Sequence, residues 1–218
     1  MVESIRVHLC GVILFLFISS SLHGQSLEEG IYYISGYINS DEYAQLKKYK
    51  TDLQLADAIY LKALDFYNGN VSETLFALTF ATLPYRQMPL EIPLIKTVLN
   101  IPLPSVDEKS FYLKVKNQPS HFFFDSPTSE FGDKDKLAHF FGNAFLSYNI
   151  HFFKLSKFMS IFVELFEGAF KVEGGVDMKD FKINTLGEFF GIELIDNNEI
   201  LPSQFLALYD LYFLTITN

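Results

Sequence analysis

Three polar side chains recur at four-residue spacing in an otherwise apolar stretch of the C-terminal half. Asp135, His139 and Asn143 stand at i, i+4 and i+8, and residues so spaced are neighbours on one side of a helix. The surrounding stretch is rich in Leu, Phe and Ala, which predicts a helix over about 133–153 that is buried on most sides. A carboxylate, an imidazole and an amide therefore share one stripe of this predicted helix, where each needs a partner.

A second apolar segment, over about 157–171, carries two carboxylates. Glu164 and Glu167 are three residues apart among Phe, Ile, Val and Leu, so a helix would place them on about one face. Carboxylates in such surroundings are costly unless they are paired, protonated or bound to a metal.

A third predicted helix, over about 177–194, carries both polar and small residues along one side. Asp180 and Asn184 are followed by Gly187 and Gly191, at i, i+4, i+7 and i+11. The two glycines are expected to let a neighbouring helix approach closely. The polar end of this helix could then face the other two stripes.

We expect these stripes to converge on one polar cluster. Its predicted members are Asp135, His139, Asn143, Glu164, Glu167, Asp180 and Asn184. The candidate catalytic residues are His139, Glu164, Glu167 and Asp180, because a histidine with several carboxylates suits general acid–base work. A divalent metal is the possible cofactor, and its ligands would be His139, Glu164 and Glu167. Two other interpretations stay open, namely a buried hydrogen-bond network that sets helix register, or a solvated face of a small bundle.

The order and spacing of these residues resemble a known signature. The segment 135–140 is similar to the D-K-x-x-H-F signature of the VanZ-like family and of the YfiM-like periplasmic lipoproteins. An E-x-x-E element at 164–167 and a D-x-x-x-N-x-x-G element at 180–187 follow in the same order. The resemblance covers about 133–195 and implies a compact helical unit in the cell envelope, without an established reaction.

The chain also departs from both families. Many VanZ-like proteins, which are integral membrane proteins associated with glycopeptide-antibiotic resistance, carry an arginine before the D-x-x-x-N element, where this chain has Glu173, Gly174 and Gly175. The lipobox cysteine of the lipoproteins is missing. The charged and polar residues in the C-terminal helices make them poor membrane spans, which favours a soluble or peripherally attached bundle.

The elements that must position the cluster divide the chain into a leader (1–24), an N-terminal region (25–130) and a C-terminal helical region (131–218). Apolar spacing predicts helices over 41–67 and 71–83, which would form a helical hairpin. Pro84–Pro104 is proline-rich and should be extended or irregular. Alternation over 110–116, with a return over 121–124, predicts a small β-hairpin. With a last helix over 203–216, the predicted fold is mainly α: a bundle of short apolar helices with a small β-hairpin.

The first residues have the features of a secretory signal sequence. Arg6 precedes an apolar run over Leu9–Ile18, and Gly24 provides the small residue before a predicted cleavage point. Cys10 is the one cysteine among 218 residues and lies too early in the run for lipidation. The expected product is an exported bacterial protein without disulfides, in the periplasm or at the membrane.

The net charge of −9 excludes nucleic acid as an expected partner, because no basic cluster accompanies it.

Three functional hypotheses remain open. The first is a non-catalytic cell-envelope protein that docks a membrane surface or another envelope protein. The second is an enzyme that uses the metal or the carboxylate–histidine set on a lipid or cell-wall intermediate. The third is a carrier with an aromatic-lined apolar pocket.

Overall fold

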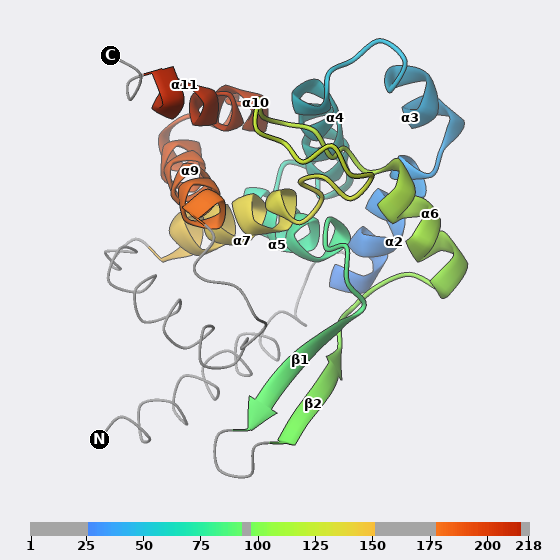
Figure 1. Cartoon of the computed structure of the whole chain (residues 1–218). Helices are drawn as coiled ribbons and strands as arrows, with labels where there is room; N and C mark the ends of the chain where they lie inside the picture. The colour runs from blue at the N-terminus through green and yellow to red at the C-terminus, as the bar shows by residue number, and fades with distance from the viewer. Residues whose placement is uncertain (1–25, 93–96, 151–177, 215–218) are drawn as a thin grey trace.

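The computed structural model describes residues 26–92, 97–150 and 178–214. These residues form a mainly α-helical fold with a small two-stranded antiparallel sheet, which confirms the predicted fold class (Figure 1). The described helices are α2 (Leu27–Ile38), α3 (Asp41–Leu46), α4 (Asp52–Phe66), α5 (Val71–Ala81), α6 (Glu108–Asn117), α7 (Lys136–Asn149), α9 (Met178–Asp196), α10 (Pro202–Leu206) and α11 (Leu208–Leu214). The strands are β1 (Gln87–Ile92) and β2 (Thr97–Pro102).

The helices surround one aromatic-rich core. α7 packs against α5 on one side and α9 on the other, α2 packs against α4 and α5, and α10 connects α4 with α9. Phe190 of α9 stacks on Phe140 of α7, with ring centroids 5.2 Å apart, and meets Tyr60 of α4 edge-on at 5.6 Å. Such ring pairs stabilise a core beyond the area that they bury, and here they tie the N-terminal helices to the C-terminal ones.

The predicted helix over 41–67 is wrong as a single element. The structure has α3 and α4 there, separated at residues 47–51. Thr51 starts a new helix because its hydroxyl accepts the amide of Gln54 while the Gln54 side chain accepts the amide of Thr51. The helix α2, for which we made no prediction, begins in the same way, with Ser26 and Glu29 forming a capping box.

The predicted helix over 71–83 is confirmed as α5. Asn68 and Gly69 form the turn before it with positive φ angles of 51° and 84°, and Asn70 caps its first turn through Glu73 N. The chain leaves this helix just before the proline-rich segment, as expected from proline's missing amide hydrogen.

The small β-hairpin exists, but its predicted position is wrong. Residues 110–116 lie in helix α6, whose buried side chains Phe111 and Lys114 follow helical spacing together with Gln118, the C-cap residue. The apolar residue Leu113 is exposed instead, so the alternation that suggested a strand does not match the buried face. The hairpin lies in the proline-rich segment, where β1 pairs with β2 from Gln87↔Pro102 to Ile92↔Thr97.

The C-terminal region contains the first and third predicted helices as α7 and α9. The fourth is wrong as one element, because it divides at Ala207 into α10 and α11, although Pro202 opens α10 as expected. The predicted leader (1–24) and the predicted helix over 157–171, with Glu164 and Glu167, lie outside the described residues. In the part of the chain that the structure describes, we find no helix with the length and apolar character needed to cross a bilayer.

The two glycines of α9 have the packing role that their spacing predicted. Gly187 lies against the Phe140 carbonyl of α7, and Gly191 lies against the Ala144 carbonyl one turn further on. A Cβ at either position would overlap the α7 backbone. This close approach brings the polar N-terminal ends of the two helices together.

Candidate functional site

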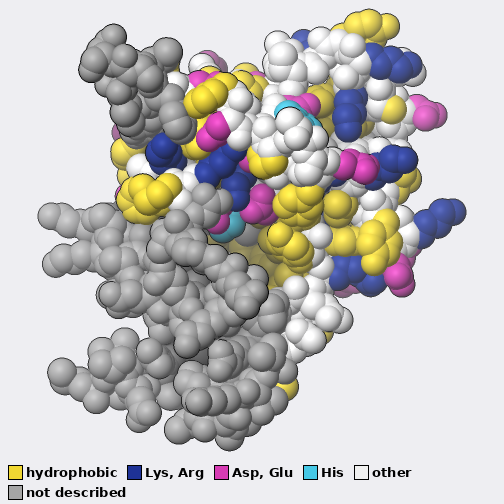
Figure 2. Space-filling view, viewed as in Figure 1, with side chains coloured by type: hydrophobic (Ala, Val, Ile, Leu, Met, Phe, Trp, Pro, Cys, Tyr) yellow, Lys and Arg dark blue, Asp and Glu magenta, His cyan; other side chains and the backbone are white. Residues whose placement is uncertain are grey.

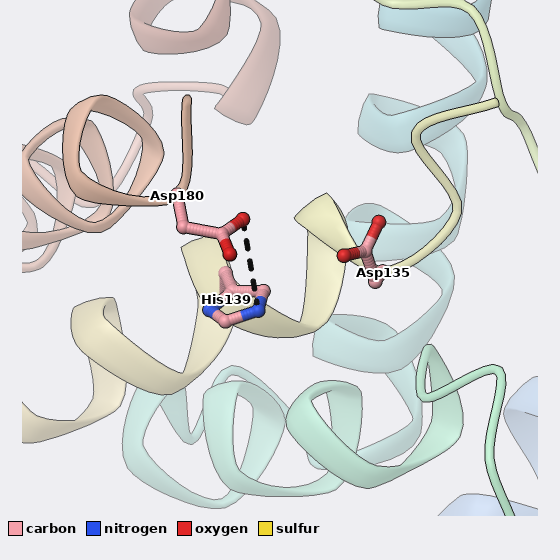
Figure 3. A group of neighbouring side chains, drawn as sticks. All are labelled: Asp135, His139 and Asp180. Carbon is pink, nitrogen blue, oxygen red and sulfur yellow. Dashed lines mark ion pairs between the residues drawn. The ribbon is translucent and has the colours of Figure 1, made fainter. Parts of the chain in front are cut away.

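The candidate site lies where α7 and α9 begin. Asp135 is the N-cap residue of α7, His139 stands in the next turn, and Asp180 lies in the first turn of α9. One ligand atom from each residue lies within 4.8 Å of the other two. Figure 3 shows the Asp180 carboxylate above His139, with Asp135 facing them from the start of α7.

The histidine is the most accessible member of this trio. His139 Nε2 lies 3.8 Å from Asp180 Oδ1, and its side chain is 39% exposed. This distance is too long for a hydrogen bond but allows an ion pair when the imidazole is protonated.

Lys136 lies between the two carboxylates. Its Nζ donates to Asp135 Oδ2 at 2.9 Å and to Asp180 Oδ1 at 2.5 Å, and its side chain is only 8% exposed. Burial alone would lower the pKa of Lys136, but the negative charges of Asp135 and Asp180 and the hydrogen bonds that they accept outweigh it and raise that pKa above its ordinary value. The ammonium group is therefore charged and occupies the position between the carboxylates.

Asp135 serves this cluster and not the end of its own helix. Aspartate at an N-cap commonly accepts a backbone amide of the first turn, but the Asp135 side chain makes no such capping bond. Its carboxylate bonds to Lys136 instead. The start of α7 thus directs a carboxylate toward α9.

An amide pair continues the polar stripe one turn deeper. Asn143 Nδ2 donates to Asn184 Oδ1 and to the His139 carbonyl, both at 2.8 Å. Asn143 Oδ1 is buried and has no hydrogen-bond partner among the described residues. The amide pair joins α7 to α9 in a defined register, because a shift of either helix would leave more amide atoms without partners.

The structure thus brings five of the predicted residues together. They are Asp135, His139, Asn143, Asp180 and Asn184. Glu164 and Glu167 lie outside the described residues, so their convergence on the site stays a prediction, as does a metal bound by them with His139.

Sequence analysis did not single out Lys136 as a member of the cluster. The only signal for it was its place in the D-K-x-x-H-F segment, beside Asp135. A lysine at the start of a helix is usually solvated, so its burial between two helices could not be predicted from local pattern.

A second buried lysine, Lys114 of α6, was also not predicted. It lies against the C-terminal end of α5. Lys114 Nζ donates to the carbonyls of Ala81 at 2.9 Å and Leu83 at 2.7 Å. Gln118 Nε2 donates to the intervening Thr82 carbonyl at 2.7 Å. These bonds satisfy the carbonyl groups that a helix C-terminus leaves free. Burial lowers the pKa of Lys114 to about 7.

The side chains of Asp135, His139 and Asp180 are suited to two kinds of chemistry. Two carboxylates and an imidazole form a suitable ligand set for a divalent transition metal, and an Asp–His pair can act as a general base. A metal at this position would have to replace the Lys136 ammonium group, because both compete for the oxygen atoms of Asp135 and Asp180.

A hollow of about 650 Å³ lies at the start of α2. Ser26, Glu28, Glu29, Tyr32, Tyr33 and Phe66 line it. The hollow has aromatic walls, but two glutamates line it as well and it is open to solvent, which differs from the apolar pocket expected of a carrier.

Comparisons with protein-family models, with curated proteins and with solved structures found no match for this chain.

Proposed function

We propose that this chain is an exported bacterial cell-envelope protein, in the periplasm or at its membrane surface, whose helical domain acts without catalysis. Its partner would be a membrane surface or another envelope protein. The observation that carries the non-catalytic part is the position of Lys136. Its ammonium group donates to both Asp135 and Asp180, offsets one of their two negative charges and holds the start of α7 to the start of α9.

The proposed location is supported by the sequence. The positive residue Arg6, the apolar run Leu9–Ile18 and the small residue Gly24 have the order of a secretory signal. The resemblance of residues 133–195 to the VanZ-like and YfiM-like families agrees with an envelope location. Membership in either family is part of this proposal.

The non-catalytic role is supported by how the polar groups are used. Lys136 donates to both carboxylates, and Asn143 bonds across the helix interface to Asn184. The bonds of Lys136 to Asp180 and of Asn143 to Asn184 cross between α7 and α9, and they require the register that Gly187 and Gly191 allow. Buried polar contacts of this kind can specify one helix arrangement.

Calorimetric titration of the full chain with Zn²⁺ and with Mn²⁺ tests this role. We expect no stoichiometric binding by the wild-type protein, since Lys136 holds the carboxylates. Lys136→Met should open the ligand set and permit binding, and adding His139→Ala to that variant should remove it again. Stoichiometric binding by the wild-type protein that is lost in His139→Ala alone would contradict the proposal.

A second candidate function is an enzyme that acts on a lipid or cell-wall intermediate. The observation in its favour is that ligand atoms of Asp135, His139 and Asp180 meet within 4.8 Å while His139 remains accessible. Glu164 and Glu167 would complete its catalytic set. Purified wild-type protein and His139→Ala should be compared on envelope lipid and cell-wall fractions, with the exposed His121→Ala as the matched control. Turnover that disappears only in His139→Ala would establish this function in place of the first.

A further inference from the structure

The hairpin β1–β2 stands apart from the helical body. It extends away from the described helices (Figure 1), and its strands pair with each other while making few contacts with any described helix. A two-stranded sheet is marginally stable in water without something packed on its apolar face. The hairpin therefore needs a contact that the helical body does not supply.

One face of the hairpin offers apolar side chains to solvent. Met88 lies directly opposite Ile101 in the strand register, so the two share a face, and Leu99 joins them because it is two residues from Ile101. Leu99 is 48% exposed and Ile101 is 36% exposed. Asn100, which lies between them, belongs to the opposite face and is also exposed.

The edges and the charge of the hairpin indicate what covers this face. Pro89 in β1 and Pro102 in β2 lack the amide hydrogens that an added strand would use, which disfavours strand addition by a second copy or a peptide.

The hairpin carries no net charge. Residues 87–102 contain one acidic and one basic residue, Glu91 and Lys96, whereas the whole chain carries −9. On the visible face of the body, acidic and basic side chains are interspersed (Figure 2). A neutral apolar projection on an acidic body suits an uncharged apolar medium better than a charged partner.

Aromatic side chains lie at the base of the hairpin. Tyr85 stands two residues before β1, its ring lies 6.2 Å from that of Phe131, and both residues are exposed. Tyrosine, with an apolar ring and a polar hydroxyl group, is favoured where lipid tails meet the headgroups. The base of the hairpin thus has the residues expected at a lipid–water boundary.

We propose that the apolar face of β1–β2 enters the interfacial layer of a lipid bilayer, with Tyr85 and Phe131 at the headgroup level. This inference rests on the proposed envelope location and assigns the membrane contact to one element. Six-residue strands span roughly 20 Å, and interfacial elements bury their apolar side only about 5–10 Å into the boundary. Because the body is acidic, the contact uses zwitterionic lipid and needs no anionic headgroup.

The chain contains no tryptophan, so one introduced indole reports on a single position in the full-length protein. Leu99→Trp would probe the apolar face, Asn100→Trp the opposite face of the same strand, and the exposed Leu61→Trp a distant helix, α4. Each variant is mixed with phosphatidylcholine vesicles with and without bromine on the acyl chains. We expect about a twofold bromine-dependent loss of emission for Leu99→Trp, since an apolar face at this depth reaches the upper acyl chains. The loss should be smaller for Asn100→Trp and absent for Leu61→Trp.

A second substitution tests the apolar requirement. Ile101→Asp, added to Leu99→Trp, should abolish the quenching while leaving the helical circular dichroism unchanged. Equal quenching at Leu99 and Leu61, or none at Leu99, would overturn the inference. So would a response that depends on protein concentration without vesicles, which would indicate a second copy, or one that requires anionic lipid. The assay uses purified protein, so its failure is distinct from a failure of export or of the metal titration.

Discussion

Lys114 and Lys136 are both buried, but their surroundings are of opposite kinds. Lys136 lies between the carboxylates of Asp135 and Asp180 at the start of α7 and α9, whereas Lys114 faces the carbonyls of Ala81 and Leu83 at the end of α5. Lys114 also lies 4.6 Å above the Phe111 ring. The first lysine has full countercharges, and the second has only partial negative charges.

The difference shows in the direction of the pKa shift. Burial lowers the pKa of Lys114 to about 7, while the carboxylates raise the pKa of Lys136 despite its burial. A buried lysine with carboxylate partners stays charged at all ordinary pH values and holds the two helices together through its ion pairs. A buried lysine on carbonyls changes its charge near neutrality, so only the second makes folding sensitive to pH in this range.

The largest expected effect is this pH dependence. Between about pH 7 and pH 10.5, the ordinary pKa of lysine, the unfolded chain keeps the Lys114 proton and the folded chain does not, so the free energy of unfolding rises with pH. The slope from this group is about 1.4 kcal/mol per pH unit, and it vanishes below about pH 7, where both states are protonated. Urea denaturation should show this rise in the wild-type protein and in the exposed control Lys116→Met. Equal slopes for the wild-type protein and Lys114→Met would contradict it.

The free energy of unfolding should be more sensitive to a methyl group added at the α7–α9 contact than to one added in α2. Gly187→Ala places a methyl group against the Phe140 carbonyl, and backbone atoms cannot rotate away, so we expect a loss of about 3 kcal/mol. Gly36→Ala in α2 meets open space and should stabilise by about 0.5 kcal/mol. Thermal unfolding of both variants measures the difference. Similar midpoints would mean that the two helices can separate at little cost.

Removing the countercharged lysine should also destabilise the fold. Lys136→Met leaves Asp135 and Asp180 facing each other without a cation, and because both are partly exposed we expect a loss of about 2 kcal/mol at pH 7. Adding Asp180→Asn should recover part of that loss. If the double variant is no more stable than Lys136→Met, the lysine acts through packing instead of charge.

The amide pair should contribute less. Asn143→Ala loses the bonds to Asn184 and His139, but it also removes the unpartnered Oδ1, so the net loss should be about 1 kcal/mol. Asn149→Ala, at the exposed end of the same helix, should cost no more than about 0.5 kcal/mol. Chemical denaturation of the two variants compares them. A larger loss of stability for Asn149→Ala than for Asn143→Ala would show that the buried amide pair does not hold the register of the two helices.

The smallest expected effect is at the histidine. His139 is half-exposed and its contact with Asp180 is a long ion pair, so His139→Ala should change stability by less than about 0.5 kcal/mol at pH 7. Thermal unfolding against pH measures this change. A loss comparable to that of Lys136→Met would make the imidazole a structural member of the cluster.

Much of the C-terminal framework was determined by the sequence. The four-residue spacing of Asp135, His139 and Asn143 and that of Asp180 and Asn184 placed each set on one helix side, and the spacing of Gly187 and Gly191 predicted a close helix contact. These features follow from the 3.6-residue helical repeat, which is local and therefore visible in the sequence. The meeting of His139 with Asp180 follows from the same pattern once the two helices are in contact.

Only the tertiary structure decided the rest. Residues 110–116 form a helix because Phe111 and Lys114 are buried together, with Gln118 just beyond them. The surrounding elements determine this burial, and strand-like alternation does not. The carbonyl partners of Lys114 and the Asp180 partner of Lys136 lie far away in the chain, so neither could be deduced from the neighbouring sequence. The sequence thus determined which side of each helix is polar, whereas tertiary contacts determined which charges meet there, because electrostatic partners depend on distance in space.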